Sequence, residues 1–216
     1  MRPAIYAMVA VLTAALAIAA AGRDHHRTVS ATARHAVHHH RAAAPLTPRQ
    51  VARAHAVAWA RGQRGMHEVG TTNCSPAIDR WEQHMGLAVP AAPPCRPWCG
   101  AFVHEAFYRA GIDLSPRLID PNETYWDAIQ HRNGLRRIPK THVVAGDIVF
   151  FALDPGVQAS HEEIVLGRPR GGRVPTAGGN VGHHAVVTRR GLRYIVLAAR
   201  VTTAPRFRSQ AGLPTT

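Results

Sequence analysis

The pattern of apolar and polar positions predicts that the ordered part of the chain opens with helices. "TPRQ" at residues 47–50 has the form of a capping box with proline at the first helical position. Apolar residues then recur at helical spacing as far as Gly62. "SPAIDRWEQHMG" predicts a second helix that is capped by Ser75 and ends at Gly86. The clearest helix runs over 98–110 and stops at Gly111.

After residue 146 the pattern changes from helical spacing to short apolar runs separated by Gly, Pro and Ser. These runs are "DIVFFAL", "HEEIVLG", "HHAVVTR" and "YIVLAAR", and each has the length and composition of a strand. A chain in which the helices come first and the strands follow is typical of an α+β domain. We therefore expect N-terminal helices packed on a small antiparallel β-sheet.

Two segments precede this domain. Residues 1–21 place Arg2 before the uncharged run "AIYAMVAVLTAALAIAAA", which we interpret as a signal peptide, with an uncleaved membrane anchor as the alternative. Residues 22–46 are rich in His and Ala without an apolar period, which is typical of a disordered linker. The folded domain is expected over 47–216, in a protein that is secreted or associated with the cell wall.

The formal net charge of +13 comes almost entirely from arginine, since Lys140 is the only lysine. From Thr47 onward there are 21 basic and 12 acidic residues, a net charge of +9. A basic surface favours polyanions in general, and export argues against nucleic acid. We expect a monomer that binds anionic cell-wall polymers. It would contact a membrane only through an uncleaved N-terminal segment.

The chain has three cysteines, so an exported protein would pair two of them and leave one. A Cys95–Cys99 bridge would close only a short loop, whereas Cys74–Cys95 would staple the preceding loop to the segment that carries Cys99. Three other interpretations of Cys99 stay open. The first is a buried cysteine that acts as a small apolar residue. The second is a zinc ligand, although the chain has no second ligand pair at the usual spacing. The third is a redox pair with Cys95, although the spacing is one residue longer than in the Cys-x-x-Cys motif.

A free Cys99 at the start of a helix points to nucleophilic chemistry. Backbone N–H groups and the helix dipole there favour the thiolate, and the same groups stabilise an oxyanion. His161 heads a predicted strand, and Asn180 follows 19 residues later, so that neighbouring antiparallel strands would bring the two together. The order Cys, His, Asn is that of papain-like enzymes. His104, His183 and His184 are weaker candidates for the base.

The motifs "PWCGAFVHEAFYRAGI", "VVAGDIVFF", "SHEEIVLG" and "TAGGNVG" together resemble the CHAP family of cysteine, histidine-dependent amidohydrolases and peptidases over roughly residues 50–200. The resemblance implies a papain-like fold and cleavage of amide bonds in peptidoglycan without a cofactor or metal. It assigns the nucleophile to Cys99, the base to His161 and the orienting residue to Asn180.

The sequence differs from the family pattern directly after the candidate base His161. The family usually has small or apolar residues after the histidine, whereas Glu162 and Glu163 follow here. A carboxylate at this place would raise the pKa of His161, replace Asn180, or pair with an arginine. Trp98, Asn73 and Glu162 are the candidates for oxyanion or substrate contacts. A protein that keeps the fold but only binds the wall through its basic surface is the alternative function.

Overall fold

Helix α1 (Pro48–Gly62) begins at the predicted capping box. The structure is a computed structural model, and it describes residues 45–115 and 119–206. The backbone N–H of Gln50 donates to the Thr47 hydroxyl, and the Gln50 side chain accepts from the Thr47 N–H at 2.7 Å. Both orphan donors of the first turn are thus satisfied, which explains why the helix starts at Pro48.

Three further helices follow before the sheet. Helix α2 (Pro76–His84) is capped by the Ser75 hydroxyl, and α3 (Cys99–Arg109) carries the candidate nucleophile at its first position, so both predicted helices are confirmed. Helix α4 (Pro121–Ile129) was not predicted. Its cap is Asp120, which accepts from the N–H of Asn122 at 2.8 Å.

The six strands form one sheet with antiparallel pairing throughout, in the order β1-β6-β2-β3-β4-β5. Their bounds are β1 Leu135–Ile138, β2 Asp147–Phe151, β3 His161–Val165, β4 Arg173–Val181, β5 His184–Gly191 and β6 Leu197–Val201. Short 3-10 turns, η2 (Lys140–His142) and η3 (Leu192–Tyr194), precede β2 and β6. The four predicted strands are confirmed, whereas β1 and β4 were not foreseen.

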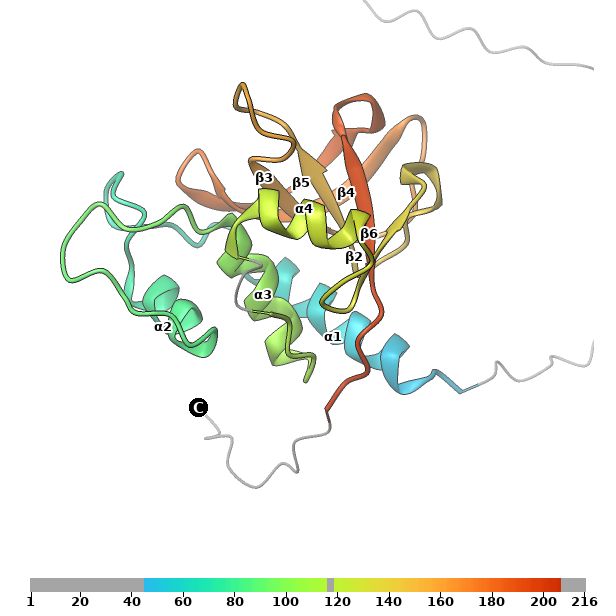
Figure 1. Ribbon diagram of the computed structural model, residues 1–216, viewed down its shortest axis with the longest axis horizontal. Helices are drawn as coiled ribbons and strands as arrows, with labels where there is room; N and C mark the ends of the chain where they lie inside the picture. The colour runs from blue at the N-terminus through green and yellow to red at the C-terminus, as the bar shows by residue number, and fades with distance from the viewer. Residues whose placement is uncertain (1–44, 116–118, 207–216) are drawn as a thin grey trace, which may run out of the picture. The chain divides into compact units, whose positions relative to one another are not determined.

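Figure 1 shows α1 and α3 together beneath the strands, with α4 lying across them. The main apolar core fills the space between helices and sheet, and includes Trp98, Phe102 and Phe150. A smaller core, which includes Phe151 and Val165, lies on the other face of the sheet. The α+β class is therefore as expected, with α3 packed directly on β3 and β4.

The predicted Cys74–Cys95 disulfide is present, and its Cα atoms are 5.2 Å apart. It spans 21 residues, and closing a loop of that length in the unfolded chain stabilises the fold by about 3 kcal/mol. Disulfides are typical of extracellular and other oxidising environments. The bridge also excludes Cys95 as a redox partner for Cys99.

Two expectations fall on residues without a described structure. The predicted signal peptide or anchor (1–21) and the linker (22–46) lie outside the described residues, apart from Pro45 and Leu46. Within the described ranges, no helix has the length and apolar character needed to cross a bilayer.

Candidate active site

Cys99 is the first residue of α3, and it is the cysteine that the disulfide leaves free. Its side chain is buried, with an exposed fraction of 2%. No side chain caps the start of this helix. Backbone N–H groups of Cys99, Gly100 and Glu162 point toward the sulfur and favour its ionised form. The sulfur therefore lies where the first turn of α3 meets the start of β3.

The electrostatic state of this sulfur differs from the expectation. Burial raises the pKa of the Cys99 thiol to about 12; the nearby Glu162 carboxyl adds to the rise, and the surrounding N–H groups oppose it. The prediction that the helix terminus holds a thiolate is wrong for this state. The dipole and the N–H groups act as expected, but desolvation outweighs them because almost no water reaches the sulfur.

Two glycines allow the backbone to close around this position. A Cβ on Gly100 would lie 2.1 Å from the carbonyl oxygen of Ile119, and a Cβ on Gly179 would lie 2.5 Å from the ring of Trp98. Neither place has room for a side chain. The start of α3 thus packs tightly against the segment before α4 on one side and against β4 on the other.

Strand β3 sends two adjacent acidic residues to opposite faces of the sheet. Glu162 shares the helix-facing side with Ile164, while His161 and Glu163 share the other side with Val165. Glu162 is completely buried, and this burial raises its pKa well above the ordinary value. Thr124 opposes the rise, and Asp120 adds to it. Burial thus favours the neutral form of Glu162, which is not an exposed substrate contact.

His161 makes its hydrogen bond to a carboxylate and not to the sulfur. Its Nε2 lies 3.2 Å from Oε1 of Glu163, and its ring packs near Phe151. Arg190 on β5 donates from Nε to both oxygens of Glu163 at 3.1 Å. Burial alone would raise the pKa of Glu163, but His161 and Arg190 outweigh it and bring the pKa to about 2. No hydrogen bond joins His161 to Cys99 in the described part of the chain.

Asn180 occupies the predicted neighbourhood but not the predicted role. Strands β3 and β4 are antiparallel neighbours that pair Ile164 with Ala177, and this register, continued by three residues, sets Asn180 opposite His161. Asn180 lies in β4 at a bulge with φ +58°, where the sequence predicted a turn. Among the described residues its side chain has no hydrogen bond to His161. Glu163 orients the imidazole instead.

The other two predicted contacts are engaged elsewhere. Trp98 is fully buried, and its indole N–H donates to Glu68 Oε2 at 3.1 Å. Asn73 donates to the carbonyl of Cys95 at 3.5 Å, in a loop position with φ +60°. The single donor of the Trp98 side chain is therefore occupied by Glu68.

Sequence reasoning missed Glu68 and Arg190. Glu68 is buried and also bonds Nδ1 of His183 at 2.6 Å, so it ties the β4–β5 turn to the residue before Cys99. A lone acidic residue in a glycine-rich loop is a weak signal for such a role. Arg190 lay in a predicted strand, but only the register of the sheet reveals which carboxylate it meets.

No group of His, Cys, Asp and Glu side chains within the described residues has the arrangement of a metal site.

Comparisons with known proteins add little to this geometry. No protein-family model matches the chain, and no curated protein matches it. Among solved structures, the chain is similar to "The crystal structure of Ly7917", at 17% identity and a TM-score of 0.36. The match covers 71% of this chain and 62% of that one, so the chain spans less than two thirds of that structure's length. A likeness at this TM-score carries no argument about fold or function.

Proposed function

We propose that the protein is an exported cysteine hydrolase with a papain-like arrangement, which cleaves amide bonds in peptidoglycan. The observation that carries the proposal is the position of Cys99. An unpaired cysteine begins a helix, three backbone N–H groups converge on its sulfur, and His161 directly precedes one of those donors. The substrate class rests on the resemblance to the CHAP family.

In the proposed reaction a neutral thiol–imidazole pair starts the chemistry. His161 takes the proton of Cys99 as the sulfur attacks the amide carbonyl, and returns it to the leaving amine. The N–H groups of Cys99 and Gly100 then stabilise the negative charge that develops on the carbonyl oxygen. Water hydrolyses the thioester, and His161 again acts as the base.

In the structure the imidazole bonds Glu163 on the face of β3 opposite the sulfur, so this reaction needs His161, the first residue of β3, to reorient toward the helix-facing side. The partly buried ion pair of Glu163 with Arg190 supplies a fixed anchor for that ring. Because Glu163 stays ionised, it also stabilises the imidazolium that forms when the thiol loses its proton. Glu163 is thus proposed as a positioning residue, in the place expected for Asn180.

The direct test compares wild type with Cys99→Ala and Cys99→Ser on purified peptidoglycan. Release of free amines or soluble muropeptides should fall by at least about a thousandfold in both variants, since alanine has no nucleophile and a serine hydroxyl ionises far less readily than a thiol. His161→Gln should cause a comparable loss. His55→Gln, a change at an exposed histidine on α1, serves as the matched control and should keep full activity. Equal release by wild type and Cys99→Ala would end the proposal.

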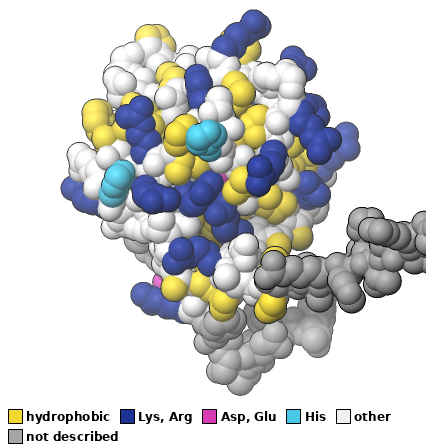
Figure 2. All heavy atoms as spheres, turned by 90° about the vertical axis from the view of Figure 1, so that its right-hand side faces the viewer, with side chains coloured by type: hydrophobic (Ala, Val, Ile, Leu, Met, Phe, Trp, Pro, Cys, Tyr) yellow, Lys and Arg dark blue, Asp and Glu magenta, His cyan; other side chains and the backbone are white. Residues whose placement is uncertain are grey.

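A second candidate is a protein that binds the wall without cleaving it. Two observations favour it: the thiol is almost completely buried, and one face carries many Lys and Arg side chains with hardly any Asp or Glu (Figure 2). Such a protein would sediment with cell walls equally as wild type and as Cys99→Ala, and salt would release it. Sedimentation without amine release would favour this candidate over the hydrolase.

A further inference from the structure

A hollow of about 770 Å³ lies between α1 and the segment that leads into β2. Its lining includes three arginines, a histidine and two small apolar residues: Arg53, Arg168, Arg200, His142, Ala54 and Ala145. The volume is within the range of sites for small ligands. Neither Cys99 nor His161 lines it, so it is separate from the candidate active site.

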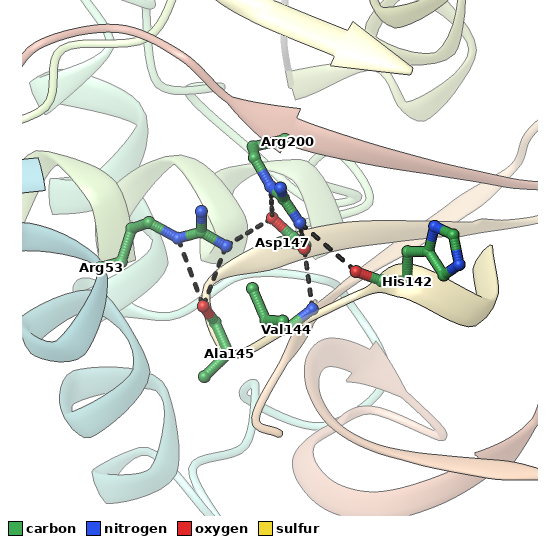
Figure 3. Close-up of polar contacts among 6 residues, drawn as sticks. All are labelled: Arg53, His142, Val144, Ala145, Asp147 and Arg200. Carbon is green, nitrogen blue, oxygen red and sulfur yellow. Dashed lines mark hydrogen bonds and ion pairs between the residues drawn. The ribbon is translucent and has the colours of Figure 1, made fainter. Parts of the chain in front are cut away.

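A single buried carboxylate organises the floor of this hollow. Asp147 is completely buried and accepts hydrogen bonds from the backbone N–H of Val144 at 2.8 Å and from Arg200 Nε at 3.0 Å. Arg53 Nη2 also bonds Asp147, and Arg53 donates from Nε and Nη2 to the carbonyl of Ala145 (Figure 3). Both guanidinium groups are thereby held in place from different elements.

The cations here exceed what Asp147 requires. Arg53, Arg168 and Arg200 carry three positive charges against one negative charge, which leaves +2, and His142 adds to this when protonated. Among the residues that the structure describes, Nη1 of Arg53 and Nη1 of Arg200 have no hydrogen-bond partner, and Arg168 has no partner at all. Asp147 thus anchors the guanidinium groups of Arg53 and Arg200 but balances only one of the three positive charges, and it makes no bond to Arg168.

The electrostatics of Arg53 agree with this excess. Burial lowers its pKa, Asp147 opposes the decrease, and the charges of Arg200 and Arg49 deepen it. A second anion in the hollow would relieve the repulsion among these cations.

We propose that this hollow binds a phosphate group. Guanidinium groups match phosphate oxygens with paired N–H donors, and unused donors of three arginines line one space. A phosphate with close to two negative charges balances the +2 of the site, whereas a single carboxylate balances half of it. The same chemistry fits free inorganic phosphate or two successive phosphates of a phosphodiester wall polymer, which carry one negative charge each.

Calorimetric titration of the full chain at low ionic strength tests the site. The probes are inorganic phosphate, poly(glycerol phosphate) and, as a monovalent comparison, acetate. Phosphate should bind saturably and at least about tenfold more tightly than acetate, because more charge-assisted hydrogen bonds form. If the polymer binds more tightly per phosphate group, the ligand of the hollow is a wall polymer. If free phosphate binds more tightly, the ligand is the free ion. Both outcomes support a phosphate site.

Matched variants separate this site from general surface charge. Ala54 is exposed on α1 and lines the hollow, so Ala54→Glu places a carboxylate among the arginines, while Ala54→Gln adds similar bulk without charge. Phosphate affinity should fall about tenfold or more in Ala54→Glu and change less than about threefold in Ala54→Gln. Arg168→Ala should also lose about tenfold, and the exposed Arg80→Ala on α2 should lose none.

Absence of saturable phosphate binding would overturn the proposal, and so would equal losses in Arg168→Ala and Arg80→Ala. The measurement reads binding and not cleavage, and Cys99→Ala should bind phosphate as wild type does. Failure here is therefore distinct from failure of the proposed hydrolase.

Discussion

The two faces of β3 hold adjacent glutamates in opposite electrostatic states. Glu162 faces the helices, has no ion pair with any described residue, and burial raises its pKa. Glu163 faces the other side, is as deeply buried, and has a pKa of about 2 because His161 and Arg190 bind it. Burial is nearly the same for both, so the presence of a cationic partner decides which one carries charge.

This difference has a consequence for the candidate nucleophile. The face that holds Cys99 is dry, and burial there favours the protonated forms of both Cys99 and Glu162. The face that holds His161 carries a fixed ion pair. Proton transfer between Cys99 and His161 would thus move positive charge toward Glu163 and create negative charge among backbone N–H groups.

The largest predicted effect concerns the reactivity of Cys99. A pKa of about 12 lies three units above the ordinary value of 9.0, which lowers the thiolate fraction near neutral pH by about a thousandfold. Iodoacetamide should therefore alkylate the folded protein about a thousandfold more slowly at pH 8 than the chain denatured with its disulfide intact. The rate should still be rising at pH 10. If the alkylation rate instead reached a plateau below pH 7, the sulfur would be ionised at neutral pH. That result would contradict the difference in charge between the two faces of β3.

The next effect concerns the charged face. Glu163→Gln removes the anion between His161 and Arg190 and should lower the free energy of unfolding by about 3 kcal/mol at pH 7. The folded pKa of Glu163 is depressed, so its stabilisation is present above about pH 4.5 and is lost as pH falls toward 2. Denaturant unfolding at pH 7 and at pH 2.5 measures this, and the gap between wild type and variant should shrink at the lower pH.

The smallest effect has the opposite sign. Glu162→Gln replaces a neutral acid by a neutral amide of the same shape, so the two proteins should be about equally stable at pH 4. The folded pKa of Glu162 is raised, so its favourable contribution is present at low pH and is lost as pH rises above the ordinary value. The variant should gain stability over wild type as pH rises from 4 to 7. A loss of stability that grows with pH would mean that Glu162 is ionised and paired.

Local sequence signals predicted much of the architecture because they act within a few residues. The caps at Thr47 and Ser75 and the helix end before Gly111 are of this kind, whereas the Cys74–Cys95 pairing followed from the number and spacing of the cysteines. The same signals were present before α4, where Asp120 and Pro121 form a cap and first position, but they were not used. Strand β4 lacked any such signal, since "RVPTAGGNV" contains Pro and Gly and is held as a strand by its pairing with β5.

The sequence placed the candidate residues in neighbouring segments but did not predict the bonds that they make. Cys99, His161 and Asn180 come from the order of motifs, and the register sets the last two opposite each other. The protonation of Cys99 depends on burial, and the partner of His161 depends on a side chain that reaches across from β5. Both are tertiary properties, and neither follows from spacing along the chain.

The most direct test of the central claim is to trap the covalent intermediate. Wild-type protein is mixed with soluble peptidoglycan fragments, quenched in acid during turnover, digested and analysed by mass spectrometry. The account predicts a substrate acyl group on the peptide that contains Cys99, absent from Cys99→Ala. Amine release by wild type with an unmodified Cys99 peptide at every quench time, together with release by Cys99→Ala, would contradict it.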